Sequence, residues 1–193
     1  MLPMLQAVAS LKMLPRSGWL FAGVAQPESV ADHSWATAVL ALTLGGEVNR
    51  DPVAQGLSAA LDMGRVAQIA IVHDLAEAVI TDLPRRATQF LGKEVKHRAE
   101  EQALVELTQA LPNCDFVALW REYSDLSTPE GRLVHDADKL EMVHQALAYE
   151  RAGNQNLGEF WQVYDWHYRV SEEMYAALVQ ARGVGGQQVR YGS

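Results

Sequence analysis

Apolar residues recur along this chain at helical spacing, and no segment shows the sustained alternation that marks a half-buried strand. One such pattern follows the segment STPE at 127–130, where apolar residues share one helical face: Leu133, Ala137, Leu140, Val143 and Leu147. A chain of 193 residues is long enough for one domain with a sizeable core and marginal for two. We therefore predict an all-α, single-domain helical bundle.

Helix start and stop signals give approximate boundaries. The predicted helices cover residues 3–13, 29–45, 61–79, 94–110 and 115–124, then a helix that begins at STPE and passes Leu147, and finally 158–182. Loops are predicted at 15–28 and 80–92. We expect the domain to span residues 1–182 and the segment GVGGQQVRYGS, residues 183–193, to form a flexible C-terminal tail.

Two of these helix starts carry capping signals. Ser29 is followed three residues later by Asp32, which stands where a capping box places its acid. The segment STPE combines a capping box with a proline inside the first turn, which is a strong helix start.

A histidine and an aspartate, His73 and Asp74, lie side by side in the apolar run IVHDLAEAVITDLP. On a continuous helix Glu77 would lie one turn beyond His73, with Asp74 about 100° around the helix. Burying such groups without compensation would cost several kcal/mol, and a divalent cation compensates them because imidazole and carboxylate are ordinary ligands. Since one helix supplies only two adjacent ligands, further ligands must come from elsewhere.

Partners are available in two distant segments: His33 in PESVADHSW, and the acids of LVHDADKLEM. A lone histidine on an apolar face is more often a hydrogen-bonded core residue, and a His-Asp dipeptide occurs by chance in many proteins. The combination of the three segments, in this order, favours a metal site. Asp136 lies nearer the apolar face of its helix than Asp138 does, so periodicity alone does not choose between them. The remaining histidines belong to no such set, and we expect them to be structural or at the surface: His97, His135, His144 and His167.

The order H…HD…D resembles the HD-domain metal-dependent phosphohydrolases. The segments RSGW, PESVADHSW, VHDLAEAVITDLP, LWREY and DADKLEM are similar to the 5′-deoxynucleotidase branch of that superfamily, over residues 10–165. The resemblance implies a helical bundle of the HD-domain type. It also implies a metal-dependent phosphomonoesterase that hydrolyses deoxyribonucleoside 5′-monophosphates to deoxynucleoside and phosphate.

The same site architecture serves other reactions of the superfamily. The alternatives are a nucleotide pyrophosphohydrolase, a hydrolase of cyclic nucleotides or guanosine polyphosphates, and a non-catalytic helical module that binds metal or nucleotide. A binding-only site would need ligands but no acid to activate water, so the presence of Glu77 favours an enzyme.

The resemblance also assigns roles to individual residues. It makes His33, His73, Asp74 and Asp138 the ligands of one divalent ion such as Mn, Co or Mg, and Glu77 the catalytic acid that positions or deprotonates the attacking water.

Substrate contacts are carried over in the same way. Arg16 matches a phosphate-binding arginine, Trp19 an aromatic residue beside the sugar, and Asp82 and Glu122 positions that line the substrate pocket. The chain departs from the family pattern at Thr81, where glycine is frequent, and in the two residues that separate Arg16 from Trp19.

The composition of the chain limits the kinds of molecule that it could bind. A net charge of −8 argues against an extended track for a nucleic-acid polymer and is compatible with a local basic pocket for a small anion such as a nucleotide. No run approaches the ~18 apolar residues that span a bilayer, and the N-terminus lacks the features of a secretory signal, so no membrane association is expected. The single cysteine, Cys114, excludes an intrachain disulfide and favours a cytoplasmic protein. The resemblance suggests a homodimer.

Overall fold

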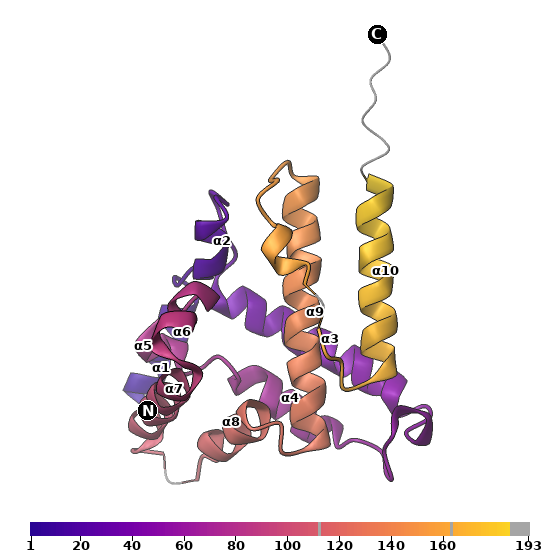
Figure 1. Cartoon of the computed structure of the whole chain (residues 1–193). Coiled ribbons are helices and arrows are strands. Elements are labelled where there is room, and N and C mark those ends of the chain that lie inside the picture. Colours follow the sequence, from indigo (N-terminus) through magenta and orange to yellow (C-terminus); the bar gives the residue numbers. More distant parts are fainter. Residues whose placement is uncertain (112, 163, 186–193) are drawn as a thin grey trace.

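The computed structural model describes residues 1–111, 113–162 and 164–185, and every regular element in these residues is a helix (Figure 1). The predicted all-α class is therefore confirmed. The helices are α1 (Leu2–Leu11), α2 (Ser17–Phe21), α3 (Val30–Val48), η1 (Val53–Gln55), α4 (Met63–Val72), α5 (Glu77–Ile80), α6 (Arg85–Leu91), α7 (Lys93–Thr108), α8 (Phe116–Ser124), α9 (Pro129–Arg151), η2 (Gly158–Phe160) and α10 (Arg169–Gly185).

The main core lies where α3, α4 and α9 pack against one another, with α8 and α10 on their outer sides. Its fully buried apolar residues include Val48 of α3, Ile69 of α4 and Leu133 and Leu140 of α9. Each buried aliphatic side chain of this size contributes about 1.5–3 kcal/mol to folding. The three helices that meet in this core are therefore held firmly relative to one another.

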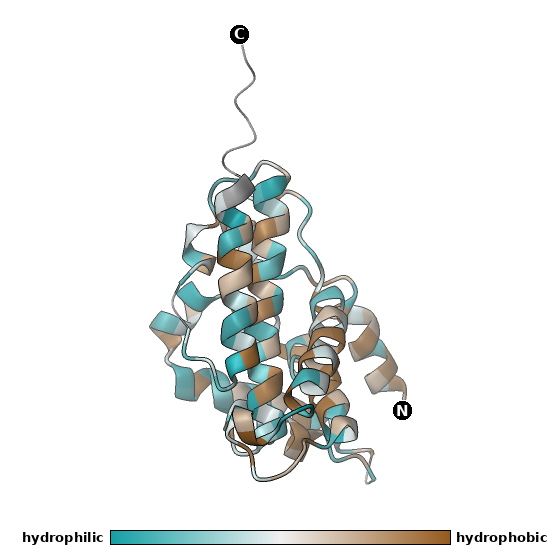
Figure 2. Cartoon of the chain, turned by 90° about the vertical axis from the view of Figure 1, so that its right-hand side faces the viewer, coloured by the Kyte–Doolittle hydropathy of each residue, from teal (hydrophilic) through white to brown (hydrophobic). Residues whose placement is uncertain are grey.

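A second group of helices, α1, α5, α6 and α7, gathers on one side of the molecule, and α9 runs through its middle with α10 beside it (Figure 1). Hydrophilic and hydrophobic residues mix around most helices, as an amphipathic pattern requires (Figure 2). Among the described residues, no helix has both the length and the hydropathy needed to cross a bilayer.

The capping prediction for α3 is confirmed, and the one for α9 is partly wrong. Ser29 accepts a hydrogen bond from the Asp32 amide (3.1 Å), and the Asp32 carboxylate accepts one from the Ser29 amide (2.9 Å). In α9 the cap is Thr128, whose hydroxyl accepts from the Gly131 amide (3.1 Å). The helix therefore begins one residue later than predicted, Gly131 stands where a capping box would need its acid, and Glu130 instead accepts from the Asp62 amide.

The predicted continuous helix over 61–79 is wrong at its C-terminal end. Helix α4 ends at Val72, and residues 73–76 form a turn before α5. In this turn Leu75 donates its amide to the Val72 carbonyl, and Glu77 donates to that of Asp74, both at 3.0 Å. Such i→i+3 bonds tighten the chain and eclipse side chains three residues apart, so Asp74 and Glu77 lie on the same side.

Other boundaries also differ from the sequence-based expectation. Short helices, α2 and α6, occupy parts of the two predicted loops, and the predicted helix over 158–182 is interrupted between η2 and α10. Buried Asp136 of α9 accepts hydrogen bonds from the amides of His167 (3.0 Å) and Tyr168 (3.2 Å), which satisfies donors at the start of α10. Helix α10 continues to Gly185, and the remainder of the expected tail, residues 186–193, lies outside the described residues.

Candidate metal centre and substrate cavity

Four of the predicted site residues converge where α3, α4 and α9 meet. Ligand atoms of His33, His73 and Asp138 lie within 4.8 Å of one another. Asp74 joins them, with its Oδ2 3.6 Å from His33 Nε2 and 3.4 Å from His73 Nε2. His33 Nε2 is also 3.2 Å from Asp138 Oδ1. Residues up to 105 positions apart in sequence thus form one buried cluster.

Both histidines present Nε2 to the acids of this cluster. The Nδ1 of His73 lies 2.8 Å from the Ala70 carbonyl oxygen, so Nδ1 carries the hydrogen and Nε2 is left with its lone pair. That Nε2 is buried and has no hydrogen-bond partner. An unpartnered imidazole nitrogen that faces carboxylates fits a cation, because a divalent ion uses both the nitrogen lone pair and the negative charges.

Electrostatics within the cluster also favour added positive charge. Burial would lower the pKa of His33, yet hydrogen bonds to Asp138 and Glu141 raise it to about 9. Burial would raise the pKa of Asp74, but the positive charge of the neighbouring Arg16 holds it well below its usual range. Burial acts in the same sense on Asp138, whose pKa is held low by Lys139 and His33. The acids therefore stay ionised and attract a cation.

Glu77 begins α5 directly beside this cluster. Its side chain is 3% exposed, and its Oε2 has no hydrogen-bond partner. Burial and the negative charge of Asp74 raise the pKa of Glu77 well above its ordinary value. A carboxyl group in this setting is suited to hold or accept a proton.

Arg16 lies across from these acids, just before α2. Its Nη1 donates to Asp74 Oδ2 at 2.9 Å and lies 4.0 Å from Glu77 and 3.8 Å from Asp82. Burial would lower the pKa of Arg16, but the three carboxylates raise it above its ordinary value, so the guanidinium is always charged. A fixed guanidinium next to the cluster is suited to bind phosphate oxygens.

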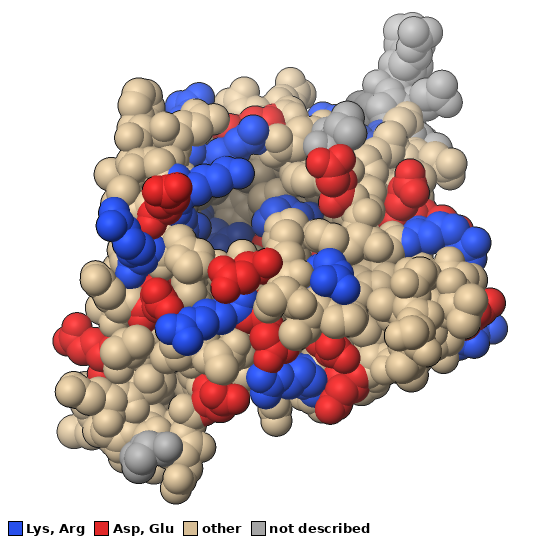
Figure 3. Space-filling view, turned by 60° about the horizontal axis from the view of Figure 1, so that its bottom comes forward, with Lys and Arg blue, Asp and Glu red and all other residues tan. Residues whose placement is uncertain are grey.

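These residues open into one cavity of about 580 Å³. The predicted residues that line it are Arg16, Trp19, Asp74, Glu77, Asp82 and Asp138. Its further lining includes cations that come from α6 and the start of α7: Arg85, Arg86 and Lys93. Figure 3 shows a face of the molecule on which Lys and Arg side chains gather around a hollow. In a chain of net charge −8, such a concentration of cations favours an anionic ligand.

Asp82 holds the Arg16 segment in place as well as lining the cavity. Its carboxylate accepts hydrogen bonds from the amide and the hydroxyl (2.8 Å) of Ser17, the first residue of α2. The preceding residue, Thr81, has φ 70° and ψ 162°, a region of backbone space that essentially only glycine occupies. The departure from the family pattern at Thr81 is therefore a point of strain beside the cavity.

Trp19 lines the cavity but is mostly a core residue. It is 2% exposed, its Nε1 donates to Glu28 Oε1 (2.9 Å), and its ring packs on Phe160 with centroids 4.2 Å apart. Only a small part of the indole is therefore available to a ligand.

The structure differs from the sequence-based expectation at Glu122, which does not line this cavity. Its carboxylate pairs with Arg65 of α4 and accepts a hydrogen bond from the Thr128 hydroxyl (3.0 Å). Because these partners tie α8 to α4 and to the start of α9, the side chain is turned to the junction of those helices.

Three residues that the sequence did not single out belong to the site. Tyr123 donates its hydroxyl to Asp138 Oδ2 (2.8 Å), and Lys139 Nζ lies 2.6 Å from the same oxygen. Glu141 Oε2 lies 2.6 Å from His33 Nδ1. All three stand within the motifs LWREY and DADKLEM. The sequence could have indicated them only because they are near neighbours, along the chain, of the predicted site residues Glu122 and Asp138.

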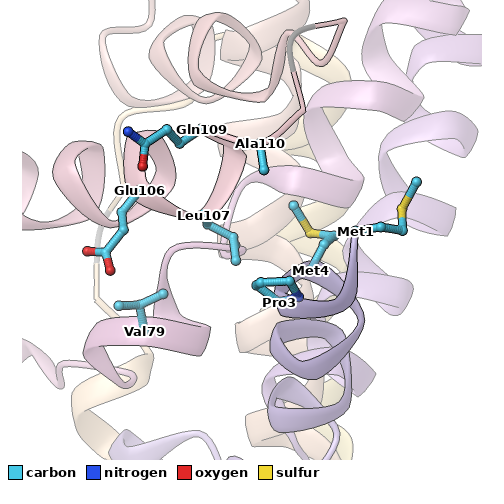
Figure 4. Close-up of a pocket in the computed structure, with 8 residues that line it drawn as sticks. All are labelled: Met1, Pro3, Met4, Val79, Glu106, Leu107, Gln109 and Ala110. Atoms are coloured by element: carbon cyan, nitrogen blue, oxygen red, sulfur yellow. The ribbon is translucent and has the colours of Figure 1, made fainter.

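A second hollow, of about 460 Å³, lies between α1, α5 and α7 (Figure 4). Its described lining is mainly apolar, with Met1, Met4, Val79 and Leu107, and Glu106 is the only charged side chain among the described residues that line it. The described residues of this hollow include no set of titratable groups, so the candidate site for chemistry is the larger cavity.

Comparison with known proteins agrees with the geometry. A family model described as the HD domain matches residues 8–178 of the chain. The 5′-deoxynucleotidase hdd1 of Schizosaccharomyces pombe is 35% identical over 167 residues, which cover 82% of this chain and 77% of that protein. The 5′-deoxynucleotidase HDDC2 of Homo sapiens is 36% identical over 154 residues, which cover 78% and 68%.

Solved structures share the whole fold. A conserved hypothetical protein from Pyrococcus furiosus is 39% identical and superposes with a TM-score of 0.78, covering 95% of this chain and 99% of that one. The helical arrangement described above is thus shared over nearly the full length of both chains.

Proposed function

The chain belongs to the HD-domain family, and we propose that it hydrolyses deoxyribonucleoside 5′-monophosphates to a deoxynucleoside and inorganic phosphate. The observation that carries the proposal is the juxtaposition, on one cavity, of a buried His/Asp cluster, a Glu77 carboxylate whose Oε2 has no hydrogen-bond partner, and a charged Arg16. Relatives named 5′-deoxynucleotidases, at 35–37% identity over most of the chain, support the choice of substrate.

The metal of such a site would be held by His33, His73, Asp74 and Asp138. Two imidazoles and two carboxylates suit a divalent ion such as Mn, Co or Mg, and the unpartnered His73 Nε2 supports this assignment. When bound, the ion would supply positive charge that offsets the charge of the phosphate, and it would lower the pKa of water towards about 7. We propose one ion per chain.

Glu77 would act as the general base. Its carboxyl group lies beside the ligands but is free of protein donors at Oε2, so it is available to orient the attacking water and accept its proton. A positioned base of this kind contributes on the order of 10²–10⁴ in rate.

Arg16 would hold the phosphate of the substrate. In the structure its guanidinium is shared among Asp74, Glu77 and Asp82, and Asp82 fixes the start of α2 that follows it. A guanidinium binds two phosphate oxygens at once, which orients the phosphorus towards the water beside Glu77.

The sugar would lie near Trp19 and Phe160, which pack together at the cavity wall. A 2′-hydroxyl placed against apolar ring edges would lose water without gaining a partner, which disfavours ribonucleotides by about 1–3 kcal/mol, or about 10–200-fold.

One observation favours a second candidate, a pyrophosphohydrolase of nucleoside polyphosphates. Arg85, Arg86 and Lys93 line the cavity, and Arg86 and Lys93 form no ion pair among the residues that the structure describes. These cations suit a longer phosphate chain as well as they suit attraction of a monophosphate from solution.

We further propose a cytoplasmic homodimer whose HD domain spans residues 1–182. An exposed apolar stripe on α3 supports the dimer, since Trp35 is 72%, Val39 48% and Leu42 42% exposed at helical spacing. The single cysteine supports a reducing compartment.

The test is phosphate release from a panel of nucleotides, with and without a chelator. Deoxyribonucleoside 5′-monophosphates should be hydrolysed well, ribonucleotides about 10–200-fold less well and 3′-monophosphates hardly at all. Release of pyrophosphate from triphosphates, with monophosphates untouched, would select the second candidate. No activity with manganese, cobalt or magnesium would refute both.

A further inference from the structure

The two histidines of the metal cluster are supported differently at Nδ1. His73 has a backbone carbonyl oxygen at that nitrogen, whereas His33 has the carboxylate of Glu141 at 2.6 Å. Glu141 lies on α9 one turn beyond Asp138, and its side chain is only 4% exposed. The acid therefore touches a ligand without belonging to the ligand set.

A second buried acid, Glu28, stands beside this contact. Carboxylate atoms of Glu28 and Glu141 and a ring nitrogen of His33 all lie within 4.8 Å of one another. Burial and the charge of Glu141 raise the pKa of Glu28 to about 7. Glu28 is in turn held by the indole N–H of Trp19 (2.9 Å), and its amide donates to the Tyr149 hydroxyl (2.8 Å).

We propose that Glu141 is a positioning residue for His33, and that Glu28 couples this contact to Trp19 in the wall of the substrate cavity. By accepting the Nδ1 hydrogen, Glu141 fixes the tautomer and the ring orientation that turn Nε2 towards Asp138 and Asp74. The route from the cavity wall to the metal centre then runs Trp19, Glu28, Glu141, His33.

The proposed coupling through Glu28 follows from the proximity of two like charges, those of Glu28 and Glu141. Two carboxylates this close repel each other unless one of them is held by a donor, and the Trp19 indole is the side-chain donor to Glu28. Loss of that donor would leave the charge of Glu28 less compensated beside Glu141, and the stronger repulsion would disturb the hydrogen bond between Glu141 and His33. Metal affinity should therefore respond to a change in the cavity wall.

The first experiment measures cobalt(II) affinity by titration of the full chain, without nucleotide, followed by visible absorption. Glu141→Met keeps the length of the side chain but removes the acceptor, and should weaken cobalt binding about 10–100-fold. Glu141→Gln retains an acceptor and should stay within a few-fold of wild type. Asp136→Asn is the matched control, since Asp136 is a buried carboxylate of the same helix that touches no proposed ligand.

The second experiment tests the coupling. Trp19→Phe keeps an aromatic ring but removes the N–H and part of the ring volume, and should weaken cobalt binding about twofold or more. In a Glu28→Gln background, which lacks the second charge, the same substitution should have no effect.

Each part has an outcome that overturns it. Cobalt binding by Glu141→Met within twofold of wild type would refute the positioning role. An unchanged affinity in Trp19→Phe would refute the coupling. A second cobalt ion per chain that is lost in Glu28→Gln would make Glu28 and Glu141 ligands instead. Because none of these measurements uses a nucleotide, they stand even if the proposed phosphatase activity, on which the role of the cavity wall rests, is absent.

Discussion

Two clusters of histidine and aspartate meet at α9, and they are built from aspartates only two positions apart. Asp136 lies with His135 and His167, and Asp138 lies with His33 and His73. By residue type each set could hold a metal, and both aspartates are buried. The difference between the two clusters lies in the partners of the carboxylates.

The partners of Asp136 are fixed. It accepts from the amides of His167 and Tyr168, and from His167 Nδ1 at 2.7 Å, so backbone donors occupy it and it serves the start of α10. All partners of Asp138 are side chains, namely His33, Tyr123 and Lys139, which can give way to a cation. Further acids, Asp74 and Glu77, stand on the Asp138 side. A buried carboxylate held by the backbone is structural, whereas one held by movable side chains beside other acids marks a reactive site.

Removal of the divalent ion should cause the largest loss of activity, and it should affect the cluster around Asp138 but not the one around Asp136. A chelator should abolish phosphate release, because a site that loses its metal loses both charge neutralisation and activation of water. Far-ultraviolet circular dichroism should keep its helical signal, since α10 depends on Asp136 and not on the ion. Activity that persists in metal-free protein would contradict the first statement, and unfolding of the helices would contradict the second.

Glu77→Gln should lower turnover about 10²–10⁴-fold while the metal stays bound. The amide keeps the size of the side chain but cannot accept the proton of the attacking water. Metal content by elemental analysis and turnover on a deoxynucleoside 5′-monophosphate are measured together. Parallel loss of metal and turnover would make Glu77 a ligand and enlarge the cluster around Asp138.

Arg16→Met should lower the catalytic efficiency on all nucleotide substrates by about 10²-fold, because the lost donors face the phosphate rather than the sugar or base. Arg16→Lys should recover part of this loss. Glu122→Gln is the control outside the cavity, and it should leave the efficiency unchanged. An effect of Arg16→Met on one nucleotide alone would show that the side chain reads another part of the substrate.

The smallest expected effect is on the free energy of unfolding, and it comes from backbone strain near the cluster around Asp138. Thr81 stands at φ 70° and ψ 162°, which costs about 1–3 kcal/mol for a residue other than glycine. Glycine relieves the strain but loses more entropy on folding, so Thr81→Gly should raise the free energy of unfolding by about 1 kcal/mol. Urea unfolding measures it. A lower free energy of unfolding would show that the threonine side chain makes a compensating contribution.

The sequence predicted which residues are buried better than it predicted what they touch. Helical periodicity located the apolar face of α9 correctly, but it did not choose between Asp136 and Asp138, because it predicts which side of a helix is buried and not which groups a buried side chain contacts. Only the resemblance pointed to Asp138, and the structure places that residue with His33 and His73.

Long-range partners account for the other differences. Glu122 pairs with Arg65, 57 positions away, and no local pattern contains that pairing. The helix through His73 breaks although its apolar spacing continues, because the turn at 73–76 is stabilised by i→i+3 bonds that any residue can form. The interruption before α10 depends on the amides of 167 and 168 reaching Asp136, which sequence spacing cannot reveal.

The most direct test of the contrast between the two clusters is the metal content of Asp136→Asn and Asp138→Asn, purified in parallel and analysed for divalent ions. Our account expects about one ion per chain in wild type and in Asp136→Asn, with the latter less stable by about 1–3 kcal/mol because charged hydrogen bonds are weakened. It expects Asp138→Asn to lose the ion and the phosphatase activity together. An empty Asp136→Asn beside a metal-loaded Asp138→Asn would contradict the assignment of the site.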